Sequence, residues 1–303
     1  MHIVMHQRTK MGVILNYSIG LGNELNLYAL YWVLKERGVD VKFDDPEQAK
    51  RAYYSKEGAV HHLTLQSLDV DDFDICSAEE KKKYLDCDSD ILNRLRRKIF
   101  GSKSKIIKEE DVKSIDDITE GYFIGNFPVF WTYEYLDVIK KHIKFKQPLG
   151  GSNKQNIEIA KEMSSNNSVS IHFRRTDYLR SENSFLNITN DDYYDKAISF
   201  IETKYNKKNM HYYIFSDDKE YIRKKYDDKK YTIIDWNDGE DGIWDFWLMT
   251  KCKHNICANS SFSTWASLLN DNQEKTMIRP IRKDAPRWYY DSLKKMGYDL
   301  IEV

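Results

Sequence analysis

Short apolar runs alternate with helical segments through the second half of the chain, and this alternation constrains the fold more than any other feature. The apolar runs lie at residues 169–173, 212–215, 231–234, 255–258 and 276–278. The segments between them have the apolar spacing of helices and lie at residues 191–205, 218–224, 243–251 and 262–269. Regular alternation of this kind predicts a parallel β-sheet with helices on both faces. Ligands of such sheets bind beyond the carboxyl ends of the strands.

A similar pattern stands near the N-terminus. Residues 12–17 are predicted to form a buried strand, and a glycine-rich turn at residues 20–23 leads into a helix that ends at Arg37. Gly38 suits the left-handed position after a helix, and residues 39–43 are predicted to form the next strand. The apolar residues of the helix recur at the spacing of one buried face, at Leu27, Leu30, Tyr31 and Leu34. We therefore predict an α/β chain with two Rossmann-like domains.

The length of the chain also suits two domains, because 303 residues exceed one average domain. The sequence Gly-Gly-Ser-Asn at residues 150–153 is the predicted linker. We therefore predict an N-terminal domain over residues 1–150 and a C-terminal domain over residues 151–303. Residues 46–118 are charged and poorly periodic, and short helices are expected there.

Charge and hydropathy exclude several classes of protein. The formal net charge is −1, so no overall field attracts nucleic acid, and an anionic ligand needs a local group of cations. The basic runs at residues 81–83 and 94–97 suit either a solvated face or a contact with phosphate or membrane. No run approaches the ~20 apolar residues of a membrane helix, and residues 1–10 lack the apolar core of a signal peptide. We predict a cytoplasmic protein, with peripheral association with the inner membrane left open.

The cysteines do not suggest a metal site. None of the four forms a Cys-x-x-Cys pair. Cys252 and Cys257 lie in an apolar stretch and are predicted to be buried thiols rather than metal ligands.

Polar side chains follow each of four predicted strands in the second half. They are Arg174, Arg175 and Asp177 after the first strand, Ser216, Asp217 and Asp218 after the second, Asp235 and Asn237 after the third, and Asn259, Ser260 and Ser261 after the fourth. The carboxyl ends of parallel strands meet at one edge of a sheet, so these side chains are expected to line a single site.

The two sides of this expected site have complementary chemistry for a diphosphate. Arginine binds phosphate oxygens in a bidentate way and stays charged at any working pH, which suits Arg174 and Arg175. Residues 259–264 start a helix, whose free N–H groups and dipole favour an anion, and their hydroxyl groups add donors. There are two alternatives to diphosphate binding. The serines would be ordinary helix caps, and the arginines would form a structural salt bridge to Asp177.

Four further positions need interpretation, and two of them, Asp245 and His172, allow two interpretations each. Asp245 stands near the start of a predicted helix, where it either favours the helix dipole or accepts two hydrogens from a guanine edge. His172 is either a satisfied core histidine or a nucleotide contact, and its place on the same strand end as Arg174 favours contact. Asp217 and Asp218 are adjacent after a strand and point apart, so they do not suit a metal, and none is expected.

Four segments resemble motifs of the bacterial α-1,2-fucosyltransferases and of the wider GDP-fucose-using group that includes the α-1,6-fucosyltransferases. Residues 20–23, with Tyr28-Ala29, are similar to the family's N-terminal turn and helix. Residues 172–178 resemble its His-x-Arg-Arg-(Gly/Thr)-Asp-Tyr motif, and residues 213–218 its strand that ends in Ser-Asp-Asp. The run over residues 245–265 is the most specific match. Together the four segments follow the family's order.

The resemblance implies a GT-B-like glycosyltransferase architecture, in which the donor binds in the C-terminal domain without a metal or other cofactor. By resemblance Arg174 would hold the β-phosphate, and His172 and Asp245 would hold the guanosine. The donor-binding residues it implies are His172, Arg174, Arg175, Asp217, Asp245, Ser261, Ser263 and Thr264, and those on the sugar and acceptor side are Gly22, Asn23 and Glu24.

The reaction that the resemblance implies is transfer of L-fucose from GDP-fucose to galactose of an acceptor glycan, α-1,2 and with inversion, in surface polysaccharide biosynthesis. Negative charge develops on the β-phosphate as the bond to the sugar breaks, and a cation held there stabilises the transition state. Arg174 is the predicted catalytic cation, and Arg175 is predicted to be structural, paired with Asp177 or another acid. Asp177 and Glu24 are the open candidates for the general base.

Two acceptor-side segments depart from the family pattern, so the acceptor stays open. They are residues 24–27 and 125–129. The alternatives are a transferase for another GDP- or UDP-sugar and a non-catalytic protein that binds a nucleotide or glycan. An NAD-dependent dehydrogenase is disfavoured, because Leu25 stands where the third glycine of the dinucleotide motif belongs.

Overall fold

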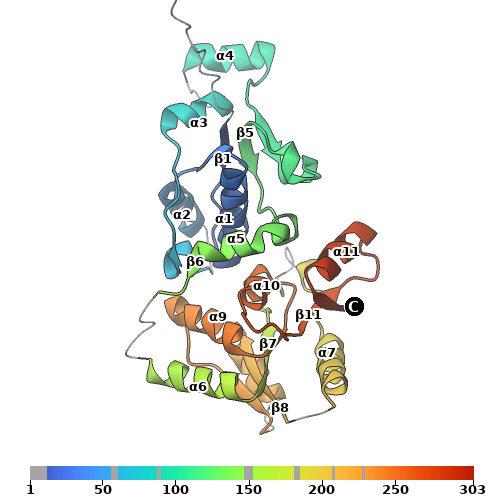
Figure 1. The fold of residues 1–303 in the computed structure, drawn as a ribbon. Helices are drawn as coiled ribbons and strands as arrows, with labels where there is room; N and C mark the ends of the chain where they lie inside the picture. The colour runs from blue at the N-terminus through green and yellow to red at the C-terminus, as the bar shows by residue number, and fades with distance from the viewer. Residues whose placement is uncertain are drawn as a thin grey trace, which may run out of the picture. The chain divides into compact units, whose positions relative to one another are not determined.

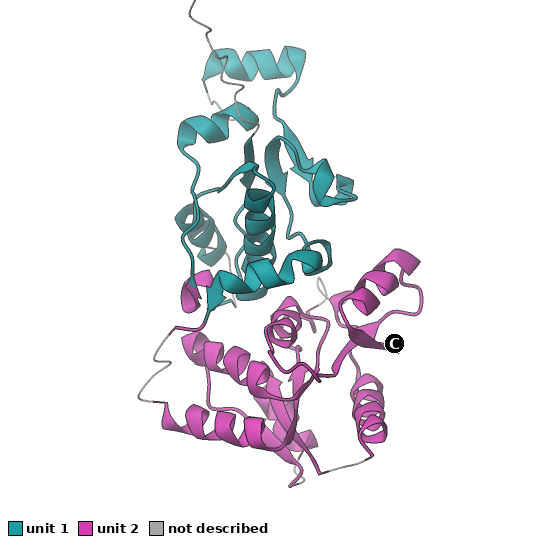
Figure 2. Cartoon of the chain, viewed as in Figure 1, with its two compact units in different colours: residues 1–61, 70–144 teal, residues 62–69, 145–303 magenta. Residues whose placement is uncertain are grey.

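The computed structural model describes residues 12–55, 61–86, 90–146, 153–180, 185–206, 209–226 and 229–303. The chain divides into two compact units, residues 1–61 with 70–144 and residues 62–69 with 145–303 (Figure 2). The second unit takes in residues 62–69, where Leu65 and Leu68 are buried. Residues 150–152 of the predicted linker lie outside the described part of the chain, and Asn153 caps the first helix after it.

The first unit contains a four-stranded parallel sheet in the order β2-β1-β5-β4. Its strands are β1 (Gly12–Leu15), β2 (Asp40–Phe43), β4 (Ile106–Lys108) and β5 (Gly121–Ile124). Its helices are α1 (Leu21–Glu36), α2 (Pro46–Tyr54), α3 (Ala78–Tyr84), α4 (Ile91–Phe100) and α5 (Leu136–Lys141). The two-residue strands β3 (Asp69–Val70) and β6 (Ile143–Lys144) pair separately.

The start of α1 differs from the predicted turn at residues 20–23. The helix already begins at Leu21, so Gly22 and Asn23 belong to its first turn. Gly20 precedes it with φ 108°, a left-handed conformation that favours glycine. The Glu24 carboxylate accepts the Gly20 N–H at 3.2 Å, which satisfies a donor at the helix start. At the other end, Gly38 has φ 74°, so its predicted left-handed conformation is confirmed.

The second unit contains a six-stranded parallel sheet in the order β12-β11-β10-β7-β8-β9. The strands are β7 (Asn167–Phe173), β8 (Met210–Ser216), β9 (Tyr231–Ile234), β10 (His254–Ile256), β11 (Met277–Ile281) and β12 (Tyr298–Glu302). The five predicted strands are confirmed, and so is the α/β class with two parallel sheets. The edge strand β12 was not predicted.

Helices cover both faces of this sheet (Figure 1). They are α6 (Lys154–Ser165), α7 (Asp191–Lys204), α8 (Lys219–Lys225), α9 (Gly242–Lys251), α10 (Ser261–Leu268) and α11 (Arg287–Lys295). Four of them were predicted, and α6 and α11 were not. Helices α6, α9 and α10 pack side by side, on the opposite face of the sheet from α7.

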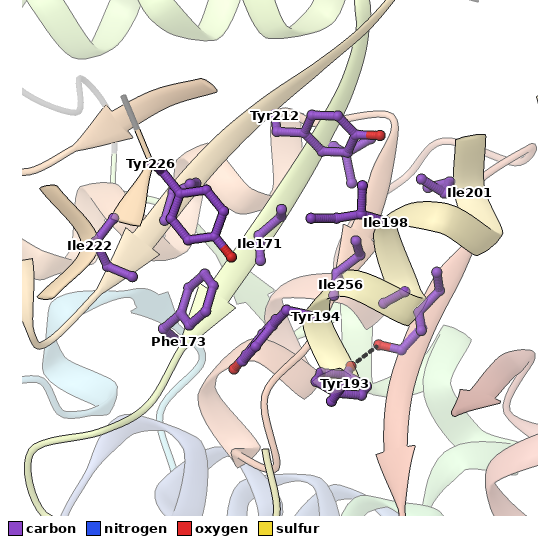
Figure 3. Close-up of a cluster of buried hydrophobic side chains, with 14 residues drawn as sticks. Ile171, Phe173, Tyr193, Tyr194, Ile198, Ile201, Tyr212, Ile222, Tyr226 and Ile256 are labelled. Carbon is purple, nitrogen blue, oxygen red and sulfur yellow. Dashed lines mark hydrogen bonds between the residues drawn. The ribbon is translucent and has the colours of Figure 1, made fainter. Parts of the chain in front are cut away.

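The core between the sheet and α7 is rich in tyrosine (Figure 3). Alternate residues of β7, among them Ile171 and Phe173, point into it, so the residues between them face α9 and α10. The Tyr193 hydroxyl donates to the carbonyl of Cys257 at 2.6 Å, and the Tyr194 hydroxyl to that of His172 at 3.0 Å. These bonds join α7 to the carboxyl ends of β10 and β7.

The described residues contain neither a membrane-spanning helix nor a cluster of metal-ligating side chains. No helix among them is long and apolar enough to cross a membrane. They also contain no group of three or more His, Cys, Asp or Glu side chains that could hold a metal ion. Cys252 and Cys257 are buried free thiols, as predicted.

Candidate active site

Four neighbouring strands, β10, β7, β8 and β9, end side by side at the carboxyl edge of the second sheet. Phe173 at the end of β7 pairs with Ser216 at the end of β8, so the segments that follow them start at the same level. The polar residues that follow the four strands therefore lie along one edge, and the predicted juxtaposition is confirmed.

Arg174, the first residue after β7, is held between two carboxylates. Its Nε lies 2.7 Å from Oδ1 of Asp177, and its Nη1 lies 3.3 Å from Oδ2 of Asp217. Only 20% of the Arg174 side chain is exposed. Burial opposes its charge, but these two acids outweigh burial and raise the pKa of Arg174 above its ordinary value. Arg174 is therefore a permanent, oriented cation at the strand edge.

Asp217 organises the segment that follows β7. Its carboxylate accepts the backbone N–H of Arg175 at 2.9 Å and that of Thr176 at 3.3 Å. It also accepts the Thr176 hydroxyl at 2.7 Å. Together with the ion pair to Arg174, these contacts occupy both carboxylate oxygens within the protein. Asp217 thus positions the arginine segment, and the direct donor contact predicted for it stays a prediction.

Arg175 turns away from Asp177. Its Nε donates to Oδ2 of Asp218 at 3.1 Å, and its guanidinium lies 3.4 Å from the ring centre of Tyr221 on α8. Asp218 also caps α8 by accepting the N–H of Tyr221. Arg175 is therefore paired with an acid and stacked on a ring, as expected for the structural member of the pair.

His172 faces α10 from the penultimate position of β7. It is 5% exposed, and its ring lies 5.5 Å from that of Phe262. Burial and the nearby positive charge of Arg174 lower its pKa to about 3, so the ring is neutral. Its Nδ1 is buried without a hydrogen-bond partner among the described residues. A buried polar atom of this kind is costly unless a ligand or water satisfies it.

Asp245 belongs to a buried polar network beyond β9. It accepts the side-chain N–H of Asn237 at 2.8 Å, and Asn237 in turn bonds with Asn156 on α6. Burial raises the pKa of Asp245 to about 7, although the bond from Asn237 opposes this rise. The sequence did not indicate Asn156, which is fully buried in the first turn of α6.

The start of α10 is capped mainly by its own side chains. Ser260 is the N-cap, and its hydroxyl accepts the N–H of Phe262. The hydroxyl groups of Ser263 and Thr264 both donate to the Ser260 carbonyl, at 3.3 and 2.8 Å. Since Ser263 is fully buried, its hydroxyl shapes the turn. Ser260 is therefore an ordinary helix cap, which was one of the two interpretations of this segment. Ser261 carries a partly exposed hydroxyl group at the start of the helix.

Tyr178 joins the arginine segment to the segment that follows β10. Its hydroxyl donates to the carbonyl of Asn259 at 2.7 Å. Burial raises the pKa of the Tyr178 phenol, and the positive charges of Arg174 and Arg279 oppose this rise. Arg279 on β11 was not predicted, because nothing near it in the sequence marks a site. Tyr178 thus lies within electrostatic reach of two arginines from different strands.

Gly22, Asn23 and Glu24 belong to the first unit, in the first turn of α1. Gly22 is buried, and Asn23 is partly exposed. Glu24 is 1% exposed and accepts the Tyr17 hydroxyl at 2.7 Å as well as the Gly20 N–H. Both carboxylate oxygens thus serve the start of α1, which does not suit a general base.

Known proteins similar to this chain are glycosyltransferases. A model of glycosyl transferase family 11 matches residues 106–302. The chain is 29% identical over 285 residues to an α-1,2-colitosyltransferase of Escherichia coli, covering 88% of this chain and 91% of the relative. It is 24% identical over 288 residues to the Escherichia coli O-antigen biosynthesis glycosyltransferase WbnK, covering 87% and 92%.

Two solved structures show a remote likeness over most of the chain. Escherichia coli heptosyltransferase WaaC with ADP has a TM-score of 0.36 at 10% identity, covering 97% of this chain and 91% of WaaC. POFUT1 in complex with GDP-fucose has a TM-score of 0.39 at 10% identity, covering 88% and 97%. The sequence relatives are therefore much more informative than these structures.

Proposed function

Since the chain belongs to glycosyl transferase family 11, we propose that it is an inverting transferase that moves L-fucose from GDP-fucose to a hydroxyl of an acceptor glycan. The observation that carries this proposal is the oriented cation Arg174 at the carboxyl edge of the second sheet. Arg174 follows β7, and α10 follows the neighbouring strand β10. A guanidinium and a helix N-terminus are complementary to a diphosphate.

The proposed mechanism uses Arg174 as an electrostatic catalyst. As the bond between the anomeric carbon and GDP breaks, negative charge accumulates on the β-phosphate. Asp177 and Asp217 hold the guanidinium in one orientation, so little reorganisation is needed during the reaction. In this mechanism Asp177 serves as the ion-pair partner of Arg174 and not as the general base. The cation and the helix start take over the task that a divalent metal performs in other transferases, so no metal is required.

Asp245 carries the proposed preference for guanine. A carboxylate can accept both N–H groups of the guanine edge, whereas adenine and uracil do not offer this pair. The bond from Asn237 holds the Asp245 side chain in one orientation. Together with the unsatisfied Nδ1 of His172, this supports a donor whose guanosine end lies toward α9 and α10.

For the acceptor we propose an α-1,2 linkage to galactose in a cell-surface polysaccharide, made in the cytoplasm. The linkage agrees with the name of the colitosyltransferase relative, and the polysaccharide with that of the O-antigen relative. The first name also supports a second donor. Colitose is the 3-deoxy analogue of fucose, so GDP-colitose would use the same diphosphate and guanine contacts.

One experiment tests both donors. The protein is incubated with GDP-fucose or GDP-colitose and a panel of galactose-terminated oligosaccharides, and the new linkage is determined by mass spectrometry and NMR. We expect one donor to give an α-1,2 product and GDP to be released only with an acceptor. Transfer from UDP-sugars alone would contradict the guanine assignment, and binding of GDP without any transfer would favour a non-catalytic role.

A further inference from the structure

Arg279 is a buried cation that has no acidic partner within the described part of the chain. It lies on β11 and is 7% exposed. No carboxylate of the described residues forms a salt bridge with it. Its Nη1 donates to the Thr264 hydroxyl at 2.6 Å, and its guanidinium lies 5.6 Å from the ring centre of Tyr298. Its Nε is buried and has no hydrogen-bond partner among the described residues.

The position of Arg279 connects it to the diphosphate site. Because Ile278 points into the α7-side core, Arg279 faces the opposite side, toward α10. The Cys257 N–H bonds to the Ile278 carbonyl, so Arg279 is level with the segment that leaves β10. The strand order β11-β10-β7 then places that segment, which leads into α10, between Arg279 and Arg174.

A structural role does not account for this arginine. Burying an unpaired charge costs more free energy than one ring contact and one neutral hydrogen bond recover. An apolar side chain would fill the same space without that cost. A bound anion, by contrast, would compensate both the charge and the unsatisfied Nε.

We propose that Arg279 is a second anion-binding residue of this site, and that it contacts the diphosphate of the donor from the β11 side of α10 while Arg174 contacts it from the β7 side. This inference rests on the proposed function for the identity of the nucleotide. The ligand chemistry itself is a diphosphate, and inorganic pyrophosphate is a sufficient probe. The Thr264 hydroxyl, which donates to the Ser260 carbonyl, orients the guanidinium toward the helix start.

The test compares Arg279→Met with Arg282→Met. Arg282 is exposed, and its side chain bonds only to Asp284 among the described residues, so its replacement is a matched control. Calorimetry with GDP, guanosine and inorganic pyrophosphate is performed on each protein. We expect Arg279→Met to weaken GDP and pyrophosphate binding roughly 10- to 100-fold, with guanosine binding and the control unchanged. Equal pyrophosphate affinity in the wild type and Arg279→Met would overturn the inference.

Thermal unfolding without ligand separates anion binding from a structural role. Loss of an uncompensated buried charge should leave Arg279→Met at least as stable as the wild type, and excess pyrophosphate should stabilise the wild type more than the variant. A large drop in melting temperature without ligand would instead indicate a structural arginine. If that variant does not fold, Arg279→Lys is tested, which keeps the charge but not the bidentate geometry. If pyrophosphate binds and its binding depends on Arg279, but GDP does not bind, then the proposed nucleotide is wrong and the proposed anion site is not.

A second and independent inference concerns α4, which lies next to α3 in the first unit (Figure 1). Half of its ten residues are exposed and apolar: Ile91 (75%), Leu92 (78%), Leu95 (52%), Ile99 (71%) and Phe100 (78%). The first four lie within an arc of roughly 100° around the helix axis. Such a continuous apolar stripe in contact with water marks an interaction surface.

The charges around the stripe identify the kind of partner. The helix contains four basic residues and no acidic one. Arg96 and Arg97 are both paired with Asp86, which holds the helix in place. Arg94 and Lys98 lie beside the stripe and form no ion pair with any described residue. Apolar residues flanked by free cations are the composition of helices that lie in the plane of an anionic membrane.

We infer that α4 docks the protein onto an anionic lipid surface. In sedimentation with vesicles, we expect binding to mixed phosphatidylglycerol and phosphatidylcholine but not to phosphatidylcholine alone, weakening with added salt. Leu92→Ser with Ile99→Ser, and Arg94→Gln with Lys98→Gln, should each lower binding at least ~10-fold. Trp288→Ser on α11, an exposed apolar residue of the second unit, is the control.

Transfer to a short soluble acceptor should be unchanged in the two α4 double variants, because their substituted residues belong to the first unit and not to the edge of the second sheet. Two results would overturn the inference. One is equal sedimentation of the wild type with and without anionic vesicles. The other is concentration-dependent dimerisation that the Leu92→Ser with Ile99→Ser variant abolishes, which would assign the stripe to a second copy of the chain.

Discussion

Replacing Asp245 by asparagine should remove guanine recognition while stabilising the protein at high pH. The wild-type carboxyl group has a pKa of about 7 in the folded protein against an ordinary value of 3.8. Between these two pH values the folded chain holds a proton on Asp245 that the unfolded chain has released. Stability from this group is thus fully present below pH 4 and is lost as the pH rises through 7.

The size of the effect follows from the pKa difference. A separation of about three pH units corresponds to on the order of 4 kcal/mol of unfolding free energy, lost at up to ~1.4 kcal/mol per pH unit. Asparagine has the same shape, keeps an oxygen for the bond from Asn237 and never ionises. The Asp245→Asn variant should therefore gain stability relative to the wild type as the pH rises from 4 to 8.

Urea unfolding at several pH values, followed by tryptophan fluorescence, measures this gain, because Trp244 and Trp247 lie on the same helix as Asp245. Asp241→Asn is a suitable control, since Asp241 is exposed and provides no side-chain cap at the start of that helix. Parallel pH profiles for the wild type and Asp245→Asn, within ~0.5 kcal/mol, would refute the reasoning, because they would mean that the carboxylate ionises in the folded protein as easily as in the unfolded chain.

The same variant tests the role of Asp245 in binding. The ionised carboxylate accepts two guanine N–H groups, so wild-type GDP affinity should rise through pH 7 more steeply than that of Asp245→Asn. Inosine diphosphate lacks the 2-amino group and should bind the wild type more weakly than GDP. In Asp245→Asn this preference should disappear, with GDP binding lowered by roughly 100-fold at pH 8. An unchanged preference for GDP would place guanine recognition elsewhere.

Two further predictions concern the arginine segment, and a third concerns the need for a metal. Arg174→Ala should lower kcat at least ~10²-fold while circular dichroism stays unchanged, and near-normal turnover would exclude Arg174 as the catalytic cation. Asp217→Asn retains the shape of the side chain but loses the ion pair and the charge-assisted bonds. The unfolding free energy of this variant should therefore fall by ~1.5–3 kcal/mol, and its kcat should fall less than that of Arg174→Ala. An unchanged melting temperature would argue against the positioning role of Asp217. Turnover after treatment with EDTA should equal that of the untreated enzyme, and recovery of lost activity by Mg²⁺ or Mn²⁺ would show that a metal is required after all.

Some parts of the chain are easier to predict from the sequence than others. The strands of the second sheet were predictable because each is a short apolar run bounded by polar residues. Helix α11 and strand β12 were missed because both are short and contain many charged residues, so neither forms a clear apolar run in the sequence. The turn predicted at residues 20–23 proved to be the first turn of α1, since the Glu24 carboxylate starts the helix one residue after Gly20.

The sequence by itself determined the α/β class, the family resemblance and the strand ends that carry polar residues, because these depend on local periodicity and on residues close together in the chain. Only the tertiary structure decided which charges meet. Asp217 proved to organise the arginine segment, and Arg279 arrives from a strand whose sequence shows no site. Such pairings depend on strand order and on which face of the sheet each side chain takes, and long-range packing sets both.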